Sequence, residues 1–270
     1  MSIKVVGRRS LLPLYPQRQS SVLVIIPAYN EQGNIPTVVE GIKRWVGFAD
    51  ILVINDGSTD ATTEVARLSG VSVLDLPMNL GIGGAVQAGL KIAVERGYPF
   101  VMRVDGDGQH NPAELIKLLE VVLRGQADVA VGSRYCDGNS TFQNPLARRI
   151  GIKLFSLVVS LCVGHRVYDT TSGMMCLDRP AICCLARYCP QDYPEVEAHI
   201  LFNKARLKVV EVPVCMRPRM TGVSSINAMR AIYYIFKVLL ATGIAALQSG
   251  PQIREEDTHV PAIANLGHFS

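Results

Sequence analysis

Two carboxylates separated by one glycine stand directly after a short apolar segment. The segment is Phe100–Val104, and the sequence Asp-Gly-Asp-Gly-Gln-His follows it at residues 105–110. Residues two apart on an extended chain point to the same side, and a glycine between them lets a ligand approach the backbone. Asp105 and Asp107 can therefore bind one hard cation together, which suits a metal-bound diphosphate. The alternative is a solvated turn that caps the helix predicted from Asn111 onward.

Three further polar loops follow predicted strands. Their sequences are Pro-Ala-Tyr-Asn-Glu at 27–31, Asn-Asp-Gly-Ser-Thr-Asp at 55–60 and Asn-Leu-Gly-Ile-Gly-Gly at 79–84. Each loop alone could be a turn with helix-capping residues. Because the carboxyl ends of parallel strands meet at one edge of a sheet, four such loops together predict a single crevice. A tyrosine ring, amides and carboxylates beside a paired-aspartate metal site suit a nucleotide diphosphate.

Short β-branched runs alternate with longer amphipathic stretches, which predicts an α/β fold of the doubly wound kind. The runs are nearly continuous in apolar residues, which indicates a mainly parallel sheet covered by helices on both faces. Helical spacing of apolar residues starts at Ile35, and Asn111-Pro112 with Glu114 gives another helix start. Helices are also predicted over 145–163 and 194–206. The predicted strands are Val22–Ile26, Ile51–Ile54, Val71–Leu74, Phe100–Val104, Asp128–Val131 and Lys208–Val214.

The composition fits one large domain. Of the 270 residues, 49% are hydrophobic, which is enough for a packed core. The net charge of +4 favours anionic ligands or an anionic membrane face, but no basic patch interleaved with aromatic residues indicates nucleic acid. The seven cysteines form no C-x-x-C pair, which favours a reduced, cytoplasmic protein. No apolar segment of signal-peptide length follows the basic N-terminus.

Two common nucleotide-binding motifs do not occur. The sequence has no G-x-x-x-x-G-K-[S/T], which excludes a P-loop, and the glycines at 81, 83, 84 and 89 do not fit G-x-G-x-x-G. The histidines at 110, 165 and 199 lack the spacing of zinc ligands. A hydride-transferring enzyme and a zinc centre are therefore disfavoured.

Four segments divide the chain. A basic extension covers residues 1–20, the α/β domain covers 21–222, an amphipathic helix covers 223–249 and a solvated tail covers 250–270. A narrow polar stripe runs along the otherwise apolar helix. This pattern fits a helix in the membrane interface or against a membrane protein, and equally a helix over the domain's own core. The stripe consists of Asn227, Arg230, Tyr234 and Lys237.

The polar motifs occur together with Val-Gly-Ser-Arg-Tyr at 131–135 and Thr-Ser-Gly at 171–173. In this order they resemble the family 2 glycosyltransferases. Within the family the chain is most similar to the dolichol-phosphate mannosyltransferase and polyprenyl-phosphate glycosyltransferase branch, over about residues 21–240. The resemblance implies a GT-A fold, which is a Rossmann-like fold for nucleotide-diphospho-sugars. It also implies a UDP- or GDP-sugar donor and a polyprenyl phosphate acceptor.

The resemblance assigns roles to individual residues. Those around the nucleotide-sugar are Pro27, Tyr29, Glu31, Asp56, Gly83 and Gly84. Those at the metal and diphosphate are Asp105, Asp107 and Gln109, with Mg²⁺ or Mn²⁺ as the cofactor. Basic positions for the donor diphosphate or the acceptor phosphate are Arg134, Arg217 and Arg219. Each of these arginines could instead be solvated or paired within the protein.

The acceptor side carries two further motifs. Asp169 and Ser172 match a family loop near the acceptor, or form an ordinary turn. Glu195 and Glu197 lie where other members carry a general base, yet Pro194 followed by glutamate is also an ordinary helix start. A lipid phosphate, whose second pKa is about 6, is already ionised and needs no base. A hydroxyl acceptor needs one.

The sequence departs from the family pattern at two places. Ile82 stands where many relatives carry a basic residue, which leaves only backbone N–H groups for a phosphate there. Met174-Met175 replaces a Phe-Arg pair, which removes an expected cation near the acceptor. Many relatives also carry transmembrane helices, and none is expected from this sequence. The amphipathic helix or a small membrane-protein partner is therefore expected to hold the protein on the cytoplasmic membrane face.

The sequence thus predicts a metal-dependent, inverting hexosyltransferase that moves a sugar from a nucleotide-diphospho-sugar to a polyprenyl phosphate. One alternative keeps the fold but uses a saccharide or glycolipid hydroxyl, with Glu195 or Glu197 as base. Another alternative is a non-catalytic nucleotide- or glycan-binding subunit of a membrane assembly. The intact pair of Asp105 and Asp107 argues against that subunit.

Overall fold

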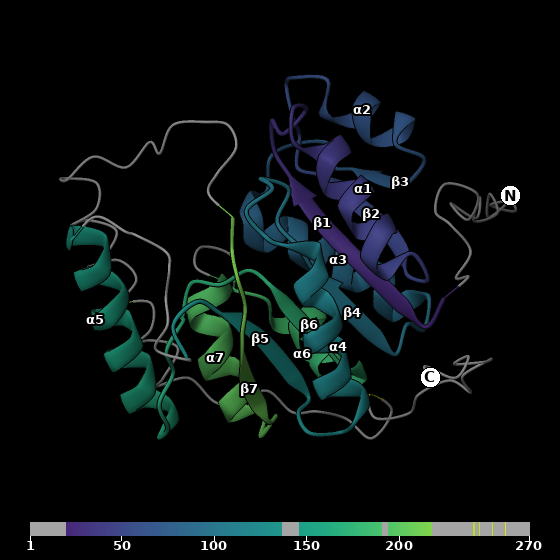
Figure 1. Cartoon of the computed structure of the whole chain (residues 1–270). Coiled ribbons are helices and arrows are strands. Elements are labelled where there is room, and N and C mark those ends of the chain that lie inside the picture. The colour runs from purple at the N-terminus through teal and green to yellow at the C-terminus, as the bar shows by residue number, and fades with distance from the viewer. Residues whose placement is uncertain are drawn as a thin grey trace, which may run out of the picture.

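The computed structural model describes residues 20–136, 146–190 and 194–217, with the single residues 240, 243, 250 and 257. These residues form a seven-stranded sheet with helices on both faces (Figure 1). The strands are β1 (Val22–Ala28), β2 (Asp50–Asn55), β3 (Ser72–Asp75), β4 (Phe100–Arg103), β5 (Val129–Ser133), β6 (Met175–Leu177) and β7 (Val209–Pro213). The helices are α1 (Ile35–Val46), α2 (Thr62–Leu68), α3 (Gly81–Glu95), the 3-10 helix η1 (Pro112–Glu114), α4 (Leu115–Leu123), α5 (Leu146–Val163), α6 (Arg179–Tyr188) and α7 (Pro194–Lys204).

The sheet is mainly parallel, as the sequence predicts. Its strand order is β3-β2-β1-β4-β6-β5-β7. All neighbouring pairs are parallel except those of β6, which runs antiparallel to both β4 and β5. The sequence analysis contains neither β6 nor the helix α6 that follows it. Three residues are too few to show a period, so pairing with the two flanking strands defines β6.

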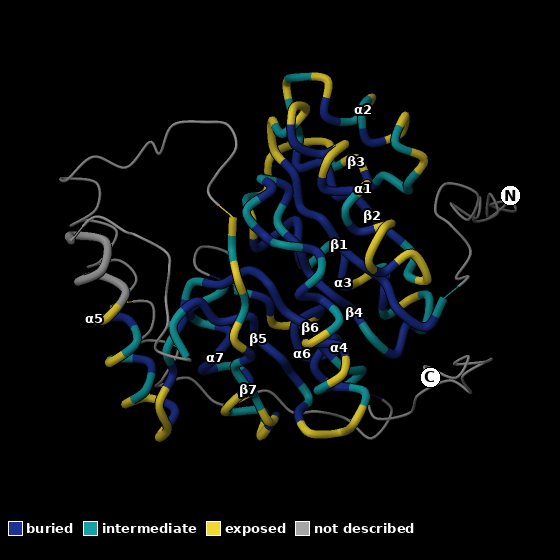
Figure 2. The backbone as a smooth tube through the Cα atoms, viewed as in Figure 1, coloured by how far each residue is buried: buried dark blue, intermediate teal, exposed yellow. Residues whose placement is uncertain are grey.

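Alternate residues of each strand point to opposite faces of the sheet, and each face packs on its own helices. Leu23 and Ile25 of β1 belong to the cluster that includes α3, α6 and α7. Val22, Val24 and Ile26 belong to the cluster with α1, α2 and α4. Figure 2 shows the central strands buried along most of their length. Burial on both faces explains why the strands appear in the sequence as continuous apolar runs.

Helix α3 lies close against the sheet at Gly89. A Cβ atom at this position would stand 2.9 Å from Cδ1 of Ile54 and 3.3 Å from Cγ2 of Ile25. Glycine therefore allows an approach that a side chain would prevent. The close packing brings the first turn of α3 beside the ends of β1 and β2.

Helix α5 packs on α7 outside the sheet, through an apolar cluster of Phe155, Val159, Val163, Val167, Val196 and Ile200. Within the described ranges, no helix combines the length and the apolar character needed to cross a bilayer. The predicted extension 1–20, helix 223–249 and tail 250–270 lie outside the described residues, apart from Ser20 and the four single positions.

Candidate functional site

The loops after β1, β2 and β4 meet at one edge of the sheet, beside the start of α3. They form an open cleft of about 230 Å³. The cleft is lined by Pro27, Ala28, Tyr29, Glu31, Asp56, Ile82, Ala85, Asp105, Gly106 and Asp107. The structure thus brings together six of the residues that the sequence assigns to the nucleotide and the metal: Pro27, Tyr29, Glu31, Asp56, Asp105 and Asp107.

Tyr29 and Glu31 form the end of the cleft that follows β1. Tyr29 is 48% exposed, which leaves an aromatic face open to a ligand. Glu31 is fixed on both sides: its backbone N–H donates to Oγ1 of Thr62 at 2.9 Å, and its carboxylate accepts from Nδ2 of Asn34 at 2.6 Å. An exposed ring beside a fixed carboxylate is suited to a flat base and to hydroxyl groups.

Asp56 joins the loop after β2 to the start of α3. Its Oδ1 accepts a hydrogen bond from the backbone N–H of Leu80 at 2.7 Å, and the residue is 4% exposed. Gly57 makes this contact possible, because it has a φ of +68° and a Cβ there would stand 2.7 Å from the nitrogen of Asn79. Part of the Asp56 carboxylate is therefore used to build the wall of the cleft.

The glycines predicted to lie in the loop at 79–84 are largely helical, since α3 begins at Gly81. Gly83 and Gly84 are buried in its first turns. The residues that face the cleft from this helix are Ile82 and Ala85. Ile82 therefore stands at the position where the family resemblance leads one to expect a cation.

Asp105 is ionised and faces the cleft. Its Oδ1 lies 3.0 Å from Nη2 of Arg103, and its backbone N–H donates to Nδ1 of His110 at 3.1 Å. Burial would raise the pKa of Asp105, but the charge and the hydrogen bond of Arg103 outweigh burial and hold the pKa below its ordinary value. The Asp105 side chain remains 30% exposed, so its carboxylate can contact a ligand.

His110 supports this loop from inside the protein. Burial lowers the pKa of His110 and outweighs the opposing effect of Asp105 and Asp107, so the imidazole is neutral. Because Nδ1 accepts a hydrogen bond, the proton is on Nε2, which lies 3.7 Å from Oδ2 of Asp105. The residue is only 5% exposed, which makes it part of the scaffold of the loop.

Asp107 and Gln109 close the turn. Oδ1 of Asp107 accepts from the backbone N–H of Gln109 at 3.0 Å, and the Gln109 carbonyl accepts from the backbone N–H of Arg217 at 2.8 Å. No three His, Cys, Asp or Glu side chains gather as a metal site in the described part of the chain. Mg²⁺ and Mn²⁺ often take one or two carboxylates and complete their shell with phosphate oxygens and water. Asp105 and Asp107 fit a divalent cation bound in that way.

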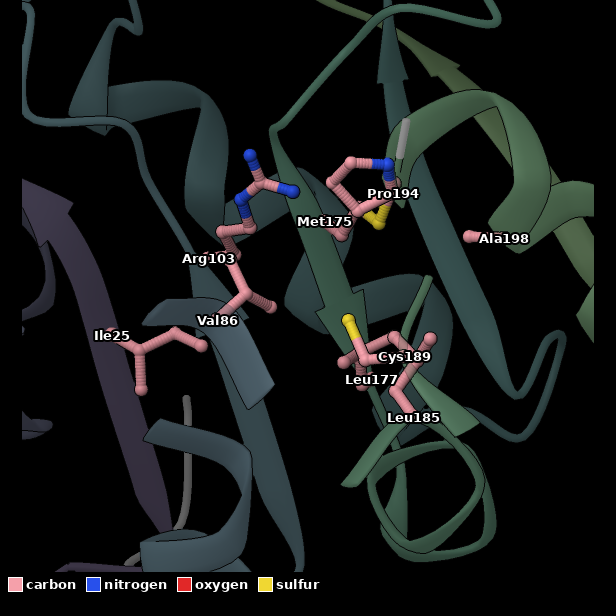
Figure 3. Close-up of a pocket in the computed structure, with 9 residues that line it drawn as sticks. All are labelled: Ile25, Val86, Arg103, Met175, Leu177, Leu185, Cys189, Pro194 and Ala198. Carbon is pink, nitrogen blue, oxygen red and sulfur yellow. The ribbon is translucent and has the colours of Figure 1, made fainter. Parts of the chain in front are cut away.

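Arg103, which the sequence analysis does not single out, belongs to the same site. Its Nη2 binds Asp105 and also lies 2.5 Å from Oε1 of Glu195. Burial would lower the pKa of Arg103, but the two carboxylates outweigh burial and raise it. Figure 3 shows Arg103 reaching from β4 towards Met175 and Pro194. One signal in the sequence could have identified it: a lone charge inside an apolar strand needs buried partners.

Arg134 and Asp169 form a buried, bidentate ion pair. Nε and Nη2 of Arg134 each lie 2.7 Å from an oxygen of Asp169, and Nη2 also donates to Thr171 at 2.7 Å. Burial would raise the pKa of Asp169, but Arg134 outweighs burial and lowers it. Asp169 is fully buried, and its backbone N–H donates to Glu211 at 2.8 Å. Arg134 is therefore an arginine paired within the protein, which is one of the two alternatives that the sequence leaves open. Asp169 fixes the orientation of its guanidinium.

The remaining predicted residues lie around this centre. Ser172 is buried, and its Oγ accepts from the backbone N–H of Met174 at 3.3 Å. Glu197 is half-buried in the first turn of α7. Arg217 is exposed and donates to Oδ1 of Asn111 at 3.2 Å, beyond the aspartate loop. Arg219 lies outside the described residues.

Comparison with known proteins gives consistent results. The family model for glycosyl transferase family 2 matches residues 23–185. A polyprenol monophosphomannose synthase of Mycolicibacterium smegmatis is 31% identical, covering 80% of this chain and 84% of that protein. An undecaprenyl-phosphate mannosyltransferase of Micrococcus luteus is 32% identical, covering 76% of this chain and 87% of that protein.

A solved structure supports the fold class. Glucosyl-3-phosphoglycerate synthase from Mycobacterium tuberculosis, crystallised with Mn²⁺, uridine-diphosphate and phosphoglyceric acid, superimposes with a TM-score of 0.65. It is 18% identical, and the match covers 86% of this chain and 80% of that chain. At this identity the comparison bears on the fold alone, and it confirms the predicted GT-A architecture.

Proposed function

The chain belongs to glycosyl transferase family 2, and we propose that it moves one sugar from a nucleotide-diphospho-sugar to a polyprenyl phosphate at a membrane face. The relatives of 31% and 32% identity carry names that specify polyprenol or undecaprenyl phosphate as acceptor and mannose as the transferred sugar. A GDP- or UDP-hexose is the donor class in this proposal. The solved neighbour holds uridine-diphosphate with Mn²⁺, which supports a divalent metal.

One observation carries the proposal: a single cleft holds an open aromatic face and two carboxylates suited to a metal-bound diphosphate. Tyr29 lies at the end that follows β1, and Asp105 and Asp107 lie at the end that follows β4. In this arrangement the base packs on Tyr29 and the ribose lies near Glu31 and Asp56. Asp105 and Asp107 hold the divalent cation at the diphosphate.

The chemistry is a single displacement at the anomeric carbon, which inverts its configuration. When bound, the cation supplies positive charge that stabilises the departing diphosphate. The protein holds the donor in place, and the ion pair of Asp105 with Arg103 fixes one wall of the cleft. A fixed orientation of the reacting groups supplies a large part of the rate enhancement in reactions of this kind.

The state of Glu195 favours a phosphate acceptor. Glu195 is one of the two candidate bases for a hydroxyl acceptor, but its Oε1 is already occupied by Nη2 of Arg103 at 2.5 Å. A phosphate monoester is ionised near neutral pH without help, since its second pKa is about 6. In this proposal an ionised oxygen of the acceptor phosphate therefore attacks the sugar directly, without a protein base.

The proposal is tested by transfer of radiolabelled sugar from a panel of GDP- and UDP-sugars into organic-extractable polyprenyl phosphate. Each reaction runs with Mg²⁺, Mn²⁺ or EDTA. Asp107→Asn removes a proposed metal ligand, and Glu120→Gln removes a matched carboxylate on the exposed face of α4. We expect lipid-linked label that requires metal, is lost in D107N and is kept in E120Q.

Three other results would contradict the proposal. Donor hydrolysis without a lipid product would point to a hydroxyl acceptor. Nucleotide binding without turnover of any donor would point to a binding subunit. Label that is equal in D107N and wild type would remove the metal from the mechanism.

A further inference from the structure

Arg103 is a buried arginine whose guanidinium binds two carboxylates with one nitrogen. Nη2 lies 3.0 Å from Asp105 and 2.5 Å from Glu195, and the Arg103 side chain is 4% exposed. A buried guanidinium is unfavourable unless its charge is compensated, so the three charged groups depend on one another. Glu195 is 92 residues away in the sequence. The contact therefore ties the first turn of α7 to the aspartate loop.

The guanidinium of Arg103 is only partly satisfied by hydrogen bonds. Nε of Arg103 is buried and has no hydrogen-bond partner within the part of the chain that the structure describes. The stem of the side chain borders a cavity of about 10 Å³ whose other walls include Ile25, Val86 and Leu185. Native proteins seldom leave a buried donor unsatisfied without a reason. In Arg103, Nη2 of the same guanidinium reaches both carboxylates.

The backbone also leaves room for this pair. A Cβ atom at Gly173 would stand 2.4 Å from Oδ2 of Asp105 and 2.9 Å from Nη2 of Arg103. Only glycine allows the segment before β6 to pass this close to the two side chains. Three separate segments thus meet at the Arg103–Asp105 contact: β4, the segment before β6 that contains Gly173, and the start of α7.

We infer that Arg103 is a positioning residue for the proposed transfer. It holds the Asp105 carboxylate towards the cleft, where the metal–diphosphate binds, and it keeps Glu195 as a counter-charge. Arg103 itself does not reach the reacting atoms in this inference. The inference rests on the proposed function, since it names the residue that orients the metal ligand of that same site.

The strand register provides a direct test. Arg103 and Met175 are partners in the antiparallel ladder of β4 and β6. Side chains paired in this way lie on one face of the sheet, with Cβ atoms about 4.5–5.5 Å apart. Figure 3 shows both residues at the same cavity. An arginine at position 175 can therefore reach the same carboxylates from the neighbouring strand. In the family pattern an arginine stands at the position of Met175, after Ser-Gly. In this chain Arg103 of β4 supplies the positive charge instead.

The experiment compares full-length wild type, R103M, the exchange variant R103M/M175R, and R179M. Arg179 is a matched control, because it donates to the backbone carbonyls of Val94 and Ala93 at the end of α3 and contacts neither carboxylate. The readouts are the Kd of GDP and of UDP measured by calorimetry with Mn²⁺ and with EDTA, and the melting temperature. Transfer to polyprenyl phosphate is measured separately.

We expect R103M to weaken Mn²⁺-dependent nucleotide binding by about tenfold or more, as loss of a partner of a metal ligand usually does. Binding in EDTA stays unchanged. The exchange variant regains most of the loss, and R179M changes only the melting temperature. R103K keeps the positive charge but lacks the planar guanidinium, and we expect it to give an intermediate affinity. If R103M does not fold, R103K takes its place in the comparison.

The inference is overturned if R103M binds Mn²⁺–nucleotide as R179M does, or if the exchange variant is as weak as R103M. A purely structural arginine would lower the melting temperature without separating metal-dependent from metal-free binding. If wild type binds Mn²⁺–nucleotide but forms no lipid-linked sugar, the proposed acceptor is wrong. The binding comparison then still decides the role of Arg103.

Discussion

One added methyl group at Gly173 is expected to impair the site without altering any of its functional side chains. In Gly173→Ala the new Cβ would stand 2.4 Å from Oδ2 and 2.7 Å from Oδ1 of Asp105. Ordinary van der Waals contact begins near 3.4 Å, so the carboxylate must retreat by about 1 Å. The carboxylate of Asp105 cannot retreat freely, because Arg103 binds its Oδ1 at 3.0 Å and Nε2 of His110 lies 3.7 Å from its Oδ2.

The size of the effect follows from this displacement. A misplacement of about 1 Å at a reacting centre costs about 10²-fold in rate, which corresponds to about 2.7 kcal/mol of transition-state stabilisation. Crowding the buried pair costs a further ~1–3 kcal/mol of folding stability. Gly33→Ala is the matched control, since no heavy atom lies within 4 Å of a Cβ at that position.

The assay is metal-dependent transfer from the donor identified above, with the melting temperature measured on the same samples. G173A is expected to be folded and about 10²-fold slower than G33A. Activity of G173A within threefold of the control would refute the reasoning. It would mean that the position of the Asp105 carboxylate, as the structure shows it, does not matter for turnover.

Three further predictions concern other parts of the chain. Arg134→Ala leaves the buried Asp169 without its partner and is expected to cost about 3–5 kcal/mol of unfolding free energy in urea; a cost below about 1 kcal/mol would contradict a buried pair. Burial and the neighbouring Asp128 raise the pKa of Asp178 to about 7, so this group lowers stability as pH rises from about 4 to 7. Asp178→Asn keeps the helix cap, and at pH 8 its unfolding free energy in urea should exceed that of wild type by at least about 1 kcal/mol. At pH 4 the two unfolding free energies should be equal. A difference that is the same at both pH values would contradict the raised pKa of Asp178. Glu197→Gln is expected to stay within tenfold of wild-type turnover if the acceptor is a phosphate, whereas a loss of several orders of magnitude would identify a base for a hydroxyl.

The alternation of elements and the position of the aspartate loop can be predicted because both depend on neighbours in the sequence. Apolar runs predict strands, and helical spacing predicts helices, since period and burial follow from local geometry. The carboxyl ends of parallel strands must share one edge of the sheet. The convergence of Tyr29, Asp56 and Asp105 on one cleft follows from these rules together.

The exact sheet could not be predicted in the same way. Strand β6 has three residues, and it becomes a strand because β4 and β5 supply hydrogen bonds on both sides. Its antiparallel direction depends on how the chain returns after α5. No local pattern carries that information.

The fold class, the family and the residues that suit a nucleotide diphosphate can be predicted from the sequence, because these depend on residue types and short spacings. The pairing of charges comes from the folded arrangement instead: Arg134 pairs with Asp169, 35 residues away, and Arg103 pairs with Glu195, 92 residues away. A buried charge is stable only beside an opposite charge, but many carboxylates in the chain could meet that need. Packing of α7 and of the segment before β6 against β4 makes the choice. It also makes Glu195, one of the two candidate bases, the partner of a buried arginine.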